Sequence, residues 1–189
     1  MERIADAFGW PLRDPRWFGK TLVVALLLLI PVVGVVNGLG WMLAALDRLR
    51  AGDQTLPPGN LTYLGRGVRL AVVELVYGLA VVVIGGSVYA SGVVILIHEG
   101  TGTASAALVA VAVGLSLVSL SLATLGSLAL TFALPPIVLA TVRGGIPGGL
   151  DARAIVKHSR AAGINTVIAG LMLIAAGLVG SLGAVLCLV

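Results

Sequence analysis

Long apolar stretches alternate with short polar ones along most of the chain. Four such stretches occupy residues 21–46, 68–97, 104–142 and 164–189, and nearly every Lys and Arg lies outside them. A run of about 18 apolar residues already indicates a helix that crosses a membrane, and each stretch is longer than that. The pattern therefore predicts one all-α domain over residues 1–189, an integral membrane helical bundle with four hydrophobic segments.

The composition supports an exterior that faces lipid. Hydrophobic residues make up 59% of the chain and charged residues 11%, whereas soluble domains carry about 25% charged residues. The 26 glycines agree with this, because small residues let membrane helices approach one another closely. The net charge of +4 comes from basic residues that flank the apolar stretches, which indicates anionic lipid head groups rather than nucleic acid as the counter-charge.

The basic residues also predict which side of the membrane each connection occupies. Residues 46–69 and residues 143–163 carry four Lys or Arg each, four more precede residue 21, and residues 98–104 carry none. Short basic loops remain in the cytoplasm. We therefore expect a multi-pass protein with residues 46–69 and 143–163 inside and residues 98–104 outside.

The first apolar stretch, residues 21–46, is interrupted in the middle. Pro31 lacks a backbone donor, and Gly34 and Gly38 follow it closely. If the stretch crosses once, the four N-terminal basic residues lie outside, whereas all twelve lie inside if it enters and returns. The charge distribution therefore favours a re-entrant hairpin, with a Pro-kinked helix as the alternative.

Two polar segments are expected to form short interfacial helices along the cytoplasmic surface. In the connection 143–163, Asp151 is a candidate N-cap and Gly163 a candidate helix stop. Between them, three basic residues share one helical face, either as contacts for lipid phosphates or as a plain anchor: Arg153, Lys157 and Arg160. Residues 1–20 form the second segment, with Trp and Phe side chains of the type enriched at membrane interfaces.

Several short motifs follow one another in a fixed order: Asp14-Pro15-Arg16-Trp17 with Lys20, Leu29-Ile30-Pro31-Val32-Val33-Gly34, Gly40-Trp41-Met42, Leu56-Pro57 and Val76-Tyr77. Together they resemble a prokaryotic membrane family known only as domain of unknown function number four thousand and thirteen. The likeness is clear from Phe8 to Ala90 and continues more weakly through Gly149-Leu150-Asp151, but Pro58-Gly59-Asn60 replaces the family's usual aromatic and acidic pair. The resemblance implies a polytopic, non-enzymatic protein of the plasma membrane of a bacterium or archaeon, and it assigns no cofactor or functional residue.

Polar side chains inside the apolar stretches are few. Glu74 is the one carboxylate there, and it is either an interface partner of Arg66 or Arg69 or part of a proton- or ion-coupling site. Asn37 is a second candidate for an intramembrane polar site, beside the break at Pro31. The two histidines, in connections expected on opposite sides of the membrane, do not form a metal site.

Small and hydroxyl-bearing residues indicate close helix packing. Gly34 and Gly38 form one small-residue face, and a second lies near the C-terminus: Ala176, Gly180 and Ala184. A row of hydroxyls lies on one face of residues 104–142, either lining a polar path or contributing to packing, and the packing interpretation is favoured. It consists of Ser116, Thr124, Ser127 and Thr131, and Ser119 and Ser121 flank it.

These patterns predict a non-catalytic membrane protein that acts by association, as an accessory or scaffolding subunit or as a homo-oligomer. Its expected partners are membrane lipids and other membrane chains or copies of itself, without cofactor, metal or nucleic acid. The alternative is a small transporter or channel component that uses the broken first stretch together with Glu74 and Asn37.

Overall fold

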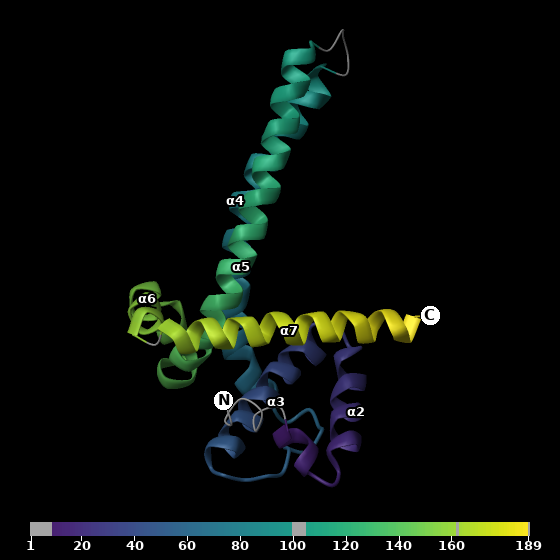
Figure 1. The fold of residues 1–189 in the computed structure, drawn as a ribbon, viewed down its shortest axis with the longest axis vertical. Coiled ribbons are helices and arrows are strands. Elements are labelled where there is room, and N and C mark those ends of the chain that lie inside the picture. Colours follow the sequence, from purple (N-terminus) through teal and green to yellow (C-terminus); the bar gives the residue numbers. More distant parts are fainter. Residues whose placement is uncertain (1–8, 100–104, 162, 189) are drawn as a thin grey trace. The chain divides into compact units, whose positions relative to one another are not determined.

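The computed structural model of the chain describes residues 9–99, 105–161 and 163–188. All the regular structure within these ranges is helical, which confirms the all-α prediction (Figure 1). The chain divides into two compact units, Met1–Val73 and Glu74–Val189, and each is described by itself.

The first unit begins with a short helical turn and a pair of helices. These are η1 (Trp10–Arg13), α2 (Trp17–Leu28) and α3 (Val33–Arg50), and the start of α4 (Leu64–Glu99) follows them. The first apolar stretch is therefore broken at residues 29–32, around the proline that predicted a break. At the break Val32 has a φ of 63°, a left-handed conformation that is rare for a β-branched residue and costs about 1–3 kcal/mol.

Two glycines let α3 pack tightly against α2. A Cβ at Gly34 would collide with the backbone of Leu27, and a Cβ at Gly38 would lie 3.1 Å from the side chain of Leu28. The close contact of these two helices accounts for the strained turn at Val32, because the packed pair holds it in place. Both glycines of the first predicted small-residue face thus contact α2 of the same chain.

The start of α4 crosses α3 at an equally short distance. A Cβ at Gly40 would collide with the carbonyl oxygen of Tyr63, and a Cβ at Gly67 would collide with that of Val36. Neither residue belongs to a small-xxx-small face identified from the sequence. This crossing places the N-terminus of α4 directly on the helical pair.

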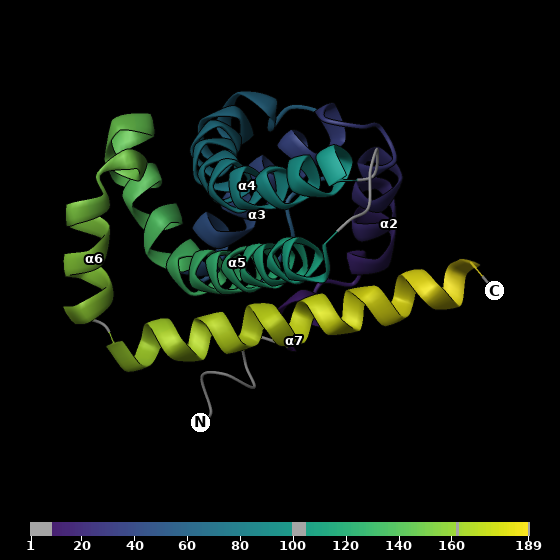
Figure 2. The ribbon, with the colours of Figure 1, turned by 90° about the horizontal axis from the view of Figure 1, so that it is seen from above.

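The second unit contains the rest of α4 together with α5 (Ala106–Leu150), α6 (Ala152–Ala161) and α7 (Gly163–Leu188). Helices α4 and α5 lie side by side in both ribbon views (Figures 1 and 2). Gly85 lies against Ala123 along this contact, and Ser119 donates a 2.8 Å hydrogen bond to the carbonyl of Gly85. α7 crosses α5 where Gly170 meets the ring of Phe132.

The hydroxyl row on α5 is largely bonded within its own helix. Four side chains of the row and its flanks donate to the carbonyl four residues earlier: Ser116, Ser121, Thr124 and Thr131. With Ser119 bonded across to α4, this agrees with the packing interpretation rather than with a polar path.

The end of α5 differs from the expected boundary at residue 142. The helix continues through Pro135-Pro136, and its backbone leaves helical geometry at Gly145, with a φ of 64°. The helix is interrupted at position 145 because its positive φ favours glycine, whereas membrane helices tolerate interior prolines when other groups satisfy the freed backbone carbonyls. Asp151 then caps α6, as predicted, since its Oδ1 accepts a 3.0 Å hydrogen bond from Ala154 N.

The apolar helices are long enough to identify a membrane protein. Among the described residues, Leu64–Ile97 of α4 and Ala106–Leu150 of α5 each have the length and composition of a membrane-spanning helix. A third span results only if α6 and the first part of α7, which meet at 102°, are counted as one bent segment. The structure thus gives two or three candidate spans and does not confirm the count of four hydrophobic segments.

The α3–α4 crossing leads to a first prediction. Gly67→Ala should destabilise the protein by about 1–3 kcal/mol, because the new methyl group would force the two backbones apart. Gly65→Ala is a matched control, since a Cβ there meets nothing within 4 Å. Thermal unfolding of both variants in one detergent tests this, and equal melting temperatures would contradict the close crossing.

Candidate functional site

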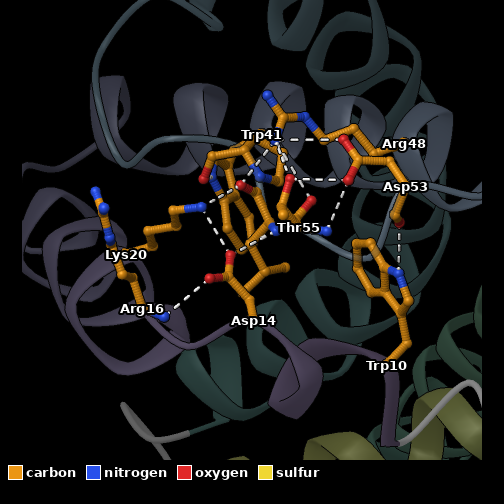
Figure 3. A network of polar contacts seen from close by, with 10 residues as sticks. Trp10, Asp14, Arg16, Lys20, Trp41, Arg48, Asp53 and Thr55 are labelled. Carbon is orange, nitrogen blue, oxygen red and sulfur yellow. Dashed lines mark hydrogen bonds and ion pairs between the residues drawn. The ribbon is translucent and has the colours of Figure 1, made fainter.

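A buried carboxylate joins the two ends of the α2–α3 pair. Asp14, which is only 3% exposed, precedes α2 and accepts hydrogen bonds from Lys20 Nζ at 2.7 Å and from the backbone N–H of Leu56 at 2.8 Å (Figure 3). Its other oxygen accepts from Arg16 N at 2.9 Å. Because Leu56 follows α3, these bonds tie the chain after the second helix to the chain before the first.

Backbone carbonyls of the segment after α3 accept the remaining bonds. The carbonyl of Leu56 receives Lys20 Nζ at 2.7 Å and Arg48 Nη1 at 3.0 Å. Two indoles complete the set: Trp10 Nε1 donates to the Asp53 carbonyl at 2.9 Å, and Trp41 Nε1 donates to the Pro57 carbonyl at 3.2 Å. We call this network the hairpin clamp, formed by Trp10, Asp14, Lys20, Trp41, Arg48 and residues 53–57.

The clamp keeps its acidic groups ionised. The hydrogen bond from Lys20 and the backbone N–H of Arg16 lower the pKa of Asp14 from 3.8 to about 2. Bonds from the backbone and hydroxyl of Thr55 lower the pKa of Asp53. Outside the clamp, Arg66 and Asp47 form an exposed ion pair.

The candidate polar residues of the apolar stretches have different surroundings. Asn37 is completely buried, and its side chain donates to the carbonyl of Asn60 at 2.8 Å and accepts from Tyr63 N at 3.3 Å. The amide therefore orders the turn that leads into α4. Glu74 is half-buried on α4, and Arg66, one of its two expected partners, contacts Asp47 instead.

The three basic residues of α6 lie on one exposed face. Together with Ala152 and Val156 they line a shallow cavity of about 500 Å³: Arg153, Lys157 and Arg160. Ile155 is 5% exposed and fixes the opposite side of the helix to the protein. This placement is compatible with either role expected for them, contact with lipid phosphates or a plain anchor.

A larger cavity, of about 550 Å³, lies between α5, α6 and α7. Apolar residues of α5 and α7 line it together with a few polar groups: Arg143, Asp151, His158, Asn165 and Thr166. No sequence pattern predicts this cavity, because it forms only where α7 folds back against α5. The one sequence feature that could have indicated it is the cluster of polar residues on both sides of Gly163.

The structure describes only some of the other residues that were singled out from the sequence, including the small-residue face near the C-terminus. A Cβ at Gly180 would meet nothing within 4 Å, and Ala176 is exposed, whereas the side chain of Ala184 lies outside the described residues. Residues 1–8 and 100–104, which include parts of the N-terminal segment and of the outer connection, also lie outside them. The described residues contain no group of three or more His, Cys, Asp or Glu that would hold a metal ion.

The chain matches a known protein family over most of its length. The family described as "Protein of unknown function (DUF4013)" matches residues 23–189, which is most of the sequence. The chain belongs to the DUF4013 family. No curated protein and no solved structure matches it.

Most of the motifs that suggested DUF4013 lie in the first unit, whereas Val76-Tyr77 belongs to the second. Leu56-Pro57 and Trp41 are members of the hairpin clamp, Gly34 contacts α2, and Gly40 contacts the segment that leads into α4. Asp14 and Lys20 precede the matched range but bond to Leu56 inside it. The motif residues of the clamp, together with Gly34, therefore hold the α2–α3 pair together.

The clamp predicts a specific dependence of stability on pH. Asp14→Asn should lower the melting temperature at neutral pH, because an amide cannot form the ion pair with Lys20. The folded-state pKa of Asp14 is lowered, so its contribution is fully present above about 4 and is lost as the pH falls through about 2. The melting-temperature difference between wild type and variant should therefore shrink across that interval.

Asp47→Asn provides the control for this experiment. Asp47 is also ion-paired, but its side chain is 45% exposed, and exposed pairs contribute little to stability. Equal destabilisation by Asp47→Asn and Asp14→Asn, or a difference that does not change with pH, would contradict the role of the clamp.

Proposed function

We propose that this DUF4013 protein is a non-catalytic integral membrane protein that acts by association, as an accessory or scaffolding subunit of a membrane complex or as a homo-oligomer. The observation that carries this is the outer surface of the two long helices. Large apolar side chains are exposed along both: Leu75, Leu79 and Val82 of α4, and Leu117, Leu120 and Leu125 of α5. Such a surface suits lipid chains and other apolar helices.

The polar groups support the same proposal. Every buried side-chain nitrogen or oxygen among the described residues has a hydrogen-bond partner. Asn37 bonds the turn before α4 and Ser119 bonds the neighbouring helix, so both serve internal packing. A substrate path needs polar groups that are available to the substrate.

The exposed small-residue face of α7 leads to a prediction about association. If another membrane helix packs there, Gly180→Leu should reduce the amount of the associated chain recovered after cross-linking in native membranes by about ten-fold, because the larger side chain prevents close approach. Mass spectrometry of the co-purified chains measures the effect.

Ala175→Leu is the matched control, since Ala175 is exposed on another face of the same helix. It should leave recovery unchanged. A protein that is recovered as a monomer without any cross-linked chain would contradict the proposed function.

We infer further that α2 and α3 form a re-entrant hairpin that enters the membrane from the cytoplasmic side. α2 has 12 residues, or about 18 Å, which is well short of the roughly 30 Å hydrocarbon layer. The hairpin clamp holds the two ends of the α2–α3 pair together. The segments that adjoin these ends are basic, and basic segments favour the cytoplasmic side of the membrane.

The turn at the tip of the pair is suited to lipid. Leu29 and Val32 are 76% and 73% exposed, so the tip is apolar. The backbone N–H groups of residues 29 and 30 donate to carbonyls at the end of α2, those of residues 33 and 34 donate to carbonyls of the turn, and Pro31 has no N–H. This reduces the cost of placing irregular backbone at membrane depth.

Cysteine labelling tests this topology. In a Cys187→Ser background, an impermeant reagent should label Leu12→Cys and Gln54→Cys from the same side and Ala106→Cys from the other. All three positions are exposed. Labelling of positions 12 and 54 from opposite sides would contradict the re-entrant hairpin and support a kinked span.

The alternative function, transport, rests on Glu74 and Asn37. Asn37 already bonds two backbone groups, so Glu74 is the stronger of the two anchors. Uptake or leak in proteoliposomes that Glu74→Gln abolishes would favour transport over association.

A further inference from the structure

We propose that the cavity between α5, α6 and α7 binds the phosphate-bearing head group of an anionic phospholipid. Its volume of about 550 Å³ lies within the range of small-molecule sites in proteins. It is lined by residues of three helices within one compact unit. The chemistry of the lining identifies the class of ligand.

Polar groups come from all three helices. Arg143 belongs to the end of α5, His158 to α6, and Asn165 and Thr166 to the first turn of α7. A guanidinium forms strong, charge-assisted hydrogen bonds with phosphate oxygens, and the amide and hydroxyl suit the phosphate and the hydroxyls of a head group. Arg143 is thus the permanent cation of the lining, and Asn165 and Thr166 add neutral hydrogen-bonding groups.

The acidic residue of the lining is already bonded. Asp151 caps α6, where its Oδ1 accepts from the backbone N–H of Ala154. His158 is fixed on the same side of the helix by a 2.7 Å contact between its Nδ1 and the Ala154 carbonyl. The carboxylate therefore has a structural partner and leaves Arg143 as the cation of the lining.

Much of the cavity wall is apolar. This part consists of Pro135, Pro136, Leu139 and Ala140 of α5 with Ala169 of α7. A free anion gains nothing from such a wall, whereas the glycerol and first acyl carbons of a lipid would bury apolar surface against it. The combination of wall and cation fits an amphiphile.

The charge around the cavity selects an anionic lipid over a zwitterionic one. Residues 135–169 contain four Lys or Arg and one Asp. Three of these basic residues lie on the other face of α6: Arg153, Lys157 and Arg160. They raise the local concentration of anionic lipid, and Arg143 binds within the cavity.

Lipid binding to the full-length purified protein tests the proposal. Native mass spectrometry in mild detergent would compare phosphatidylglycerol, phosphatidylcholine and inorganic phosphate as probes. Wild type should bind phosphatidylglycerol in preference to phosphatidylcholine, and Arg143→Gln should weaken that binding by about ten-fold. Arg143→Lys should restore part of it, because the positive charge returns.

Arg50→Gln is the matched control, since it removes the same charge from an exposed position in the first unit, which contributes neither to the cavity lining nor to α6. It should change phosphatidylglycerol binding by less than about two-fold. Ala169→Phe, which fills the cavity without changing the charge, should also reduce binding. The melting temperature of each variant without lipid shows that it is folded.

Three results would overturn the proposal. Equal losses in Arg143→Gln and Arg50→Gln would indicate non-specific attraction by positive charge. Equal binding of the two lipids would remove the charge selectivity, and inorganic phosphate that competes as effectively as phosphatidylglycerol would indicate a free-anion site. None of these results depends on whether the chain associates with other proteins.

Discussion

The bond network around Asp14 is the interaction on which the first unit depends. A pair of apolar helices has little core of its own, so the polar bonds that join its ends contribute strongly to its geometry. The carboxylate of Asp14 and the ammonium of Lys20 hold the backbone of Leu56 from both sides, by its N–H and its carbonyl. Because both backbone groups are used, the segment after α3 has one position relative to α2.

The glycine contacts, like the clamp, hold the helices of the first unit together. Gly34 and Gly38 set the distance between α2 and α3 near the tip, and Gly40 with Gly67 sets the crossing with α4. Asn37, on α3 between these contacts, orders the turn into α4. The unit is therefore held by backbone proximity and buried polar bonds rather than by bulky side chains, which is the usual way for helices to associate in lipid.

The sequence predicted the features that depend on residue type. Helical structure follows from the apolar stretches, the break near Pro31 from a missing backbone donor, and the cap at Asp151 from its short carboxylate. The clamp was not predicted, because its acceptors are mostly backbone carbonyls, which leave no signature in the sequence. The cavity beside Arg143 was not predicted either, since it requires the long-range contact of Gly170 with Phe132. The third apolar stretch was expected to end at residue 142, whereas α5 continues past it and its backbone leaves helical geometry at Gly145.

The span of the clamp along the chain has a consequence for biosynthesis. Asp14 and Leu56 are 42 positions apart, so the clamp cannot close until all of α3 and the segment after it have left the ribosome. Until then α2 is an apolar helix without its partner. Closure of the hairpin clamp is therefore a late step in the formation of the first unit, completed only as α4 begins to emerge.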